Sequence, residues 1–71
     1  MTQDPRIRTV KRRGVIFAEV SYNDAQEWSA DDLDSALESH GLQRDTRALL
    51  PQYKKDVHGS ITHVLIAVQP A

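Results

Sequence analysis

The stretch ITHVLIAVQ at residues 61–69 is the most strand-like part of this sequence, and it decides the fold. Its middle, from Val64 to Val68, is β-branched or apolar on both alternating faces. A strand with two apolar faces is typical of the interior of a sheet. Pro70 ends it because proline has no amide hydrogen to donate. We therefore place this strand at the centre of a sheet.

A second strand precedes it at residues 46–54, TRALLPQYK. Pro51 cannot donate to a sheet ladder, which places this strand at an edge or at a bulge. Between the two strands, residues 56–60 contain Gly59 and predict a turn. The second half of the chain therefore reads as a pair of strands.

The first half predicts another pair of strands. RIRTVK at residues 6–11 is highly charged and suits an exposed edge, and GVIFAEVSY follows at residues 14–22. Arg13-Gly14 is a plausible turn between them; one long strand with a bulge at Gly14 is the alternative. Alternation gives the second strand an apolar face of Ile16, Ala18, Val20 and Tyr22.

A helix is predicted after a polar connection at residues 23–28. Ser29 and Asp32 form an S-x-x-D capping pattern, and Trp28 is placed to pack on Leu33 as a hydrophobic staple. Gly41 stands where the residue after the helix needs a positive φ. The helical spacing of one apolar stripe is carried by Leu33, Ala36, Leu37 and His40.

These elements predict a small two-layer α+β domain of order β-β-α-β-β. An antiparallel or mixed sheet would carry one helix on one face. We expect residues 1–5 to form a flexible tail and residues 6–71 the single domain. The uncovered sheet face is a candidate partner surface, and a homodimer through it or through an edge strand would bury more area.

Several functional classes find no support in the sequence. It has no cysteine, which excludes disulfides and thiolate metal sites and favours a cytoplasmic location. No apolar run is long enough to cross a membrane. No nucleophile elbow, phosphate-binding glycine loop or zinc-protease helix motif occurs, so we expect no enzyme and no cofactor. The spacing of His40, His58 and His63 predicts no metal site.

Charge is strongly segregated along the chain. Residues 1–14 carry a net charge of +4, residues 15–41 carry −7 without any Lys or Arg, and residues 42–71 carry +2. The cations of the first segment could neutralise phosphates, or they could protect an edge strand from aggregation. They are Arg6, Arg8, Lys11, Arg12 and Arg13. The pI of about 6.2 argues against a dedicated nucleic-acid binder.

Two further features point to a protein partner. Asp31, Asp34 and Glu38 lie at helical spacing opposite the apolar stripe, where they could dock on a basic protein surface or form a solvated helix face. Tyr53, beside two lysines on the proline-containing strand, is a candidate exposed anchor.

We therefore expect a small non-enzymatic regulatory or adaptor module that binds a protein with a basic surface through the acidic helix face. The basic N-terminal arm would add electrostatic steering or a second contact. An inhibitor or modulator of a nucleic-acid-handling complex fits this description. The alternatives are a nucleic-acid-binding protein that uses the basic N-terminal hairpin, and a self-assembling structural unit.

Overall fold

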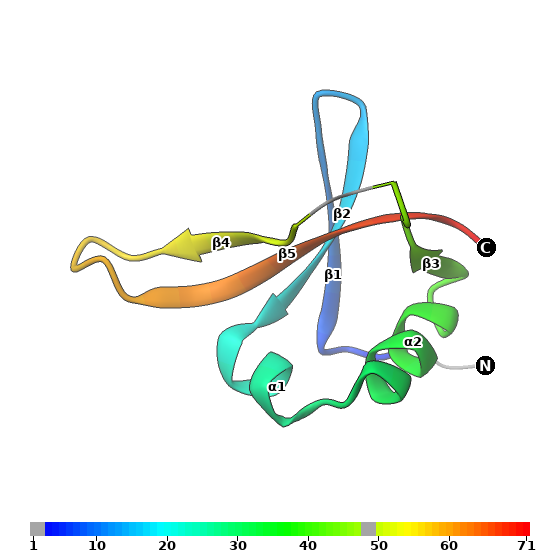
Figure 1. The fold of residues 1–71 in the computed structure, drawn as a ribbon, viewed down its shortest axis with the longest axis horizontal. Coiled ribbons are helices and arrows are strands. Elements are labelled where there is room, and N and C mark those ends of the chain that lie inside the picture. The colour runs from blue at the N-terminus through cyan, green and yellow to red at the C-terminus, as the bar shows by residue number, and fades with distance from the viewer. Residues whose placement is uncertain (1–2, 48–49) are drawn as a thin grey trace.

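Strand β5 (Ile61–Pro70) organises the sheet of this protein, seen here in a computed structural model that describes residues 3–47 and 50–71. Two strands, β1 (Ile7–Arg12) and β2 (Val15–Ser21), precede two short helices, α1 (Tyr22–Glu27) and α2 (Ala30–Glu38). Strands β3 (Leu42–Arg44) and β4 (Gln52–Lys55) come before β5. The fold is a small α+β domain, as expected (Figure 1).

β5 is hydrogen-bonded along both of its edges. β2 pairs with it from Ile16↔Val68 to Ser21↔His63, so β3 and β4 must share the opposite edge. β4 pairs with the first half of β5 and β3 with its last residues. All pairings are antiparallel, and β1 flanks β2. The prediction that ITHVLIAVQ is the central strand is therefore confirmed.

The predicted turn at Arg13-Gly14 closes a two-residue hairpin between β1 and β2. Arg12 pairs directly with Val15, and the two loop residues have φ values of 52° and 79°. Two successive positive φ angles define the type I′ turn, whose twist matches that of the flanking strands. The alternative of one long bulged strand is therefore wrong.

The helical region holds one more helix than predicted. α2 begins as expected, because the Ser29 side chain accepts from the Asp32 amide and the Asp32 carboxylate accepts from the Ser29 amide. Residues 23–28, expected to be a polar connection, lie largely in α1. The Ser21 hydroxyl caps this helix by accepting from the amide of Asp24. Tyr22 consequently begins a helix and does not extend the apolar face of β2.

The second half of the chain also differs from the prediction. The expected strand at residues 46–54 is replaced by β3, which begins directly after Gly41, and by β4, which begins only after Pro51. Gly41 has the predicted positive φ, 70°, which turns the chain from α2 straight into β3. The order is therefore β-β-α-α-β-β-β; the part of the prediction on residues 48 and 49 lies outside the described residues.

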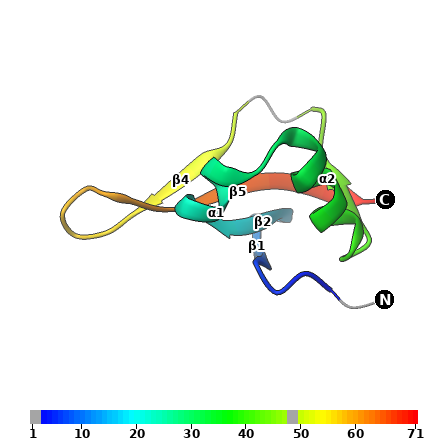
Figure 2. The same ribbon diagram turned by 90° about the horizontal axis from the view of Figure 1, so that it is seen from below.

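The core lies between the helices and one face of the sheet (Figure 2). Leu37 of α2 is fully buried there, against a cluster that includes Ala18, Val20 and Val68. Strand alternation places Phe17, Glu19 and Leu65 on the other face, which no helix covers. The sheet thus has a helix-covered face and an open face.

In residues 3–47 and 50–71, no helix is long and apolar enough to cross a membrane.

Replacement of Leu37 by alanine tests the core. We expect Leu37→Ala to lower the free energy of unfolding by about 2–5 kcal/mol, because the change leaves a cavity under α2. Leu50→Ala, at a leucine that is 82% exposed, should change it by less than about 0.5 kcal/mol. Urea unfolding followed by circular dichroism measures both, and equal losses in the two variants would contradict this core.

Candidate functional site

An apolar groove lies on the helix-covered face, between the helices and four described residues that follow β3 or precede β4: Asp45, Thr46, Leu50 and Pro51. It has a volume of about 890 Å³. Its floor is lined by the sheet residues Val20, Val64 and Ile66, of which Val20 and Val64 are buried and Ile66 is half-buried. Of the two helices, α1 packs on β5 and β2, and α2 packs on β3.

Aromatic side chains stand around this floor. Trp28, between the two helices, and Tyr22 come from the helical side, and Tyr53 comes from β4. Tyr53 is 51% exposed, so its ring offers apolar area to solvent. Leu50 and Pro51 complete the wall on that side. The groove therefore combines an aliphatic floor with aromatic walls, the composition of many binding sites.

The charged side chains at the groove are mainly acidic. Asp34, Glu38 and Asp45 line it, with Arg44 as the one basic residue among the described lining residues. Arg44 forms a bidentate ion pair with Asp34, at 2.8 and 3.0 Å, which links β3 to α2. Glu38 is exposed at the end of α2, and none of the salt bridges among the described residues involves it.

Three of the four residues predicted to bind a protein come together at this groove. They are Asp34, Glu38 and Tyr53. Asp31, the fourth, is exposed in the first turn of α2 and does not line the groove. The sequence did not predict the apolar floor, because its residues match the pattern of an ordinary hydrophobic core. Trp28 was assigned to a helix staple; it packs against the core and also lines the groove.

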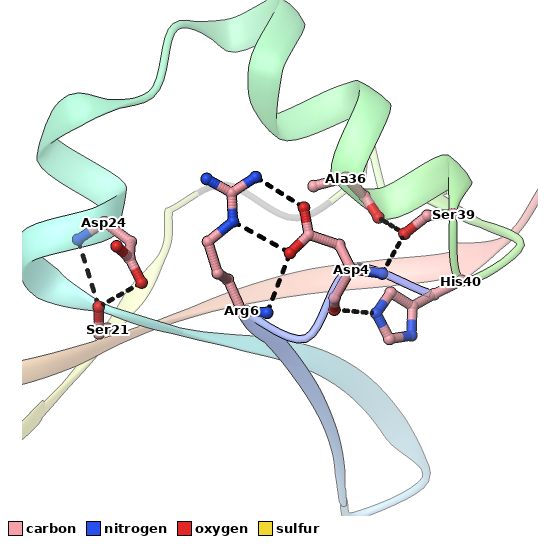
Figure 3. A network of polar contacts seen from close by, with 7 residues as sticks. All are labelled: Asp4, Arg6, Ser21, Asp24, Ala36, Ser39 and His40. Atoms are coloured by element: carbon pink, nitrogen blue, oxygen red, sulfur yellow. Dashed lines mark hydrogen bonds and ion pairs between the residues drawn. The ribbon is translucent and has the colours of Figure 1, made fainter. Parts of the chain in front are cut away.

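The N-terminal segment is attached to the end of α2 (Figure 3). The Asp4 amide donates to the Ser39 hydroxyl at 2.9 Å, and the His40 Nε2 lies 2.8 Å from the Asp4 carbonyl oxygen. The Asp4 carboxylate accepts from the Arg6 guanidinium at 2.7 and 3.0 Å. Asp4, placed in the expected flexible tail, is thus held to the domain; Met1 and Thr2 lie outside the described residues.

Arg6 is separated from the other predicted cations by these contacts. Its guanidinium pairs with Asp4 and lies 4.4 Å from the centre of the Trp28 ring, a cation–π contact. The other four cations lie on the β1–β2 hairpin and are exposed. They are Arg8, Lys11, Arg12 and Arg13. Of the five predicted cations, Arg6 therefore contacts Asp4 and Trp28 within the domain, and the other four form a basic surface on the β1–β2 hairpin.

Local hydrogen bonds lower the pKa values of three carboxylates, those of Asp4, Asp32 and Asp45. The side-chain hydrogen bond from Arg6 is the main reason why the pKa of Asp4 falls to about 2. The backbone amide of Ser29 lowers the pKa of Asp32 in the capping box. The Arg47 side chain lowers the pKa of Asp45. All three carboxylates are therefore charged at neutral pH and already have partners.

No cluster of three or more His, Cys, Asp or Glu side chains that could hold a metal ion occurs within residues 3–47 and 50–71. On the open sheet face, the His63 Nε2 lies 3.8 Å from the buried Glu19 carboxylate.

Comparisons with known protein families, with curated proteins and with solved structures give no match for this chain.

The Asp4–Arg6 pair predicts a pH dependence. Because the pKa of Asp4 is lowered from an ordinary 3.8 to about 2, its contribution to stability is present above about pH 4 and is lost as the pH falls towards 2. Asp4→Asn should therefore be less stable than the wild-type protein at pH 7, and the gap should close by pH 2. In urea unfolding, the gap for Arg6→Gln should narrow over the same pH range without closing, because the cation–π contact with Trp28 does not depend on Asp4. A gap that does not change with pH in either variant would contradict the assignment.

Proposed function

We propose that this protein is a non-enzymatic binding module that accepts an apolar, lysine- or arginine-flanked peptide segment of another protein in the groove. The observation that carries the proposal is a groove whose wall exposes the apolar side chains of Tyr53 and Leu50, with mainly acidic side chains at its border. The groove offers contact area and charge attraction. The described residues that line it include no histidine to act as a general base, and their one serine, Ser29, is used as a helix cap.

The dimensions and the side chains of the groove suit a peptide. A volume of about 890 Å³ lies within the roughly 300–1,000 Å³ of typical binding pockets and accommodates several apolar side chains. Tyrosine and tryptophan are the commonest anchors of protein interfaces. Tyr53 and Trp28 face the groove from its two sides, so a bound segment would lie between them.

The charges at the border favour a basic partner. Asp34 is already paired with Arg44, so Glu38 is the groove carboxylate best placed to meet a partner's cation. Complementary charge contributes mainly to the rate and the specificity of association. Complexes that handle nucleic acids present basic surfaces, so we retain an inhibitor or modulator of such a complex, in the cytoplasm, as the proposed biological role.

The test is selection of a displayed library of random 12-residue peptides on the immobilised protein. We expect enrichment of sequences in which apolar or aromatic residues are flanked by Lys or Arg. Their affinities can be measured through the fluorescence of Trp28, the only tryptophan of the chain and a groove residue. Dissociation constants should lie in the micromolar range, and Tyr53→Ala should weaken binding about tenfold or more.

Matched variants assign the site. Glu38→Lys should weaken the selected peptides several-fold, whereas Glu27→Lys, the same change at an exposed α1 position outside the groove, should not. Selected peptides that bind Tyr53→Ala and Glu38→Lys as tightly as the wild-type protein would overturn the proposal. So would a selection that enriches acidic peptides. Sedimentation of the free protein detects the alternative, a self-assembling unit that covers the groove with a second copy.

A further inference from the structure

The charge segregation of the sequence becomes a separation between layers in the structure. Six of the ten acidic residues lie on the two helices. The strands carry six Lys or Arg side chains and one acidic residue, Glu19, which is only 9% exposed. The acidic layer and the basic layer therefore do not neutralise one another, apart from the single pair between Asp34 and Arg44.

The cations of the strand layer are concentrated on the β1–β2 hairpin. Arg8 and Arg12 lie on the open face, because their cross-strand partners Glu19 and Val15 are on that face. Lys11 points to the other face, and Arg13 occupies the turn. All four side chains are exposed, and no acidic residue lies between residues 5 and 18. None of the salt bridges among the described residues involves them.

The hairpin also has a defined shape. Its turn end extends away from the helices, well separated from the turn of the β4–β5 hairpin (Figure 1). The type I′ turn holds the two strands in register up to the Arg12↔Val15 pair. The four cations are therefore held on the edge strand β1 and its tight turn, with little loop flexibility, so that mainly side-chain entropy is lost on binding.

We propose that the β1–β2 hairpin binds the phosphate backbone of a nucleic-acid duplex, with its turn end pointing into the major groove. The major groove of B-form DNA, roughly 12 Å wide, admits two strands, and the end of the hairpin from Arg12 to Val15 lies beyond the pairing of β2 with β5. Arg8 and Arg12 on the open face, Arg13 at the turn and Lys11 on the other face can each reach a phosphate oxygen. Val10 and Phe17, cross-strand neighbours on the open face, supply apolar contact between the cations. Binding is of the backbone type, without a sequence code.

This surface is distinct from the peptide groove. None of the four hairpin cations lines the groove, and the groove lies on the helix-covered face. The two activities can therefore fail or succeed independently. If both hold, the module connects a protein segment on one side to a duplex on the other.

The experiment is fluorescence anisotropy of the full chain with a fluorescein-labelled 20-base-pair DNA duplex of mixed sequence, at 50–200 mM KCl. We expect a dissociation constant of about 10⁻⁴–10⁻⁶ M, the range of backbone binding. If all four cations contact phosphates, the slope of log K against log salt should be about −3.6. In Arg12→Gln/Arg13→Asn the slope should become less steep by about 1.8. Asn-Gly is a preferred type I′ pair, so this variant keeps the turn.

A charge-matched variant provides the control. Arg44→Gln/Arg47→Gln removes the same charge from two arginines that are engaged with Asp34 and Asp45, and it should leave affinity and slope nearly unchanged. Equal losses in the two double variants, or no binding at 50 mM KCl, would overturn the proposal. Tighter binding to one labelled strand of the duplex than to the duplex itself would overturn the proposed duplex geometry. Poly-glutamate of matched charge that binds as well as the duplex would assign the hairpin to an acidic protein partner instead.

Discussion

Hydrogen bonding along both edges of β5 is the constraint on which the rest of this structure depends. β2 occupies one edge, and β3 and β4 divide the other between them. The helices follow β2, so they pack over the part of the sheet where Val20 and Leu37 are buried. Asp45, Thr46, Leu50 and Pro51, between β3 and β4, line the groove on this face. The groove lies beside the helices on this face of the sheet, with Ile66 of β5 in its floor.

The same arrangement explains why a chain of nearly neutral net charge can present two surfaces of opposite sign. The acidic segment folds into the helices, and the basic N-terminal segment becomes a hairpin beyond them. Two of the three Arg–Asp pairs among the described residues, Asp4–Arg6 and Asp45–Arg47, join residues two apart in the chain. Such pairs neutralise charge locally and leave the hairpin and Glu38 available. The proposed peptide site and the proposed duplex site therefore rest on one feature, the separation of charge between layers.

Prediction from the sequence succeeded where the decisive interactions are local. The capping box of α2, the positive φ at Gly41 and the turn at Arg13-Gly14 each depend on a few neighbouring residues. It failed for α1, which buries no residue and so has no apolar stripe to indicate a helix. It also failed for β3, because three residues are too few to show a period of two. Pro51 was predicted to lie within an edge or bulged strand; it lies before β4 instead, and β4 pairs along β5 with an irregular register at Lys54 and Lys55.

The sequence by itself determined the α+β class, the central strand, the capped helix and the segregation of charge, because composition and short-range spacing fix these properties. Only the tertiary structure decided which charged groups are engaged. Arg44 meets Asp34 ten residues away, and the Asp4 carbonyl meets His40 across 36 residues. Tertiary packing also turned core-like residues into the floor of a groove beside Tyr53. Contacts of this range depend on how the layers pack against β5, and no local pattern encodes that packing.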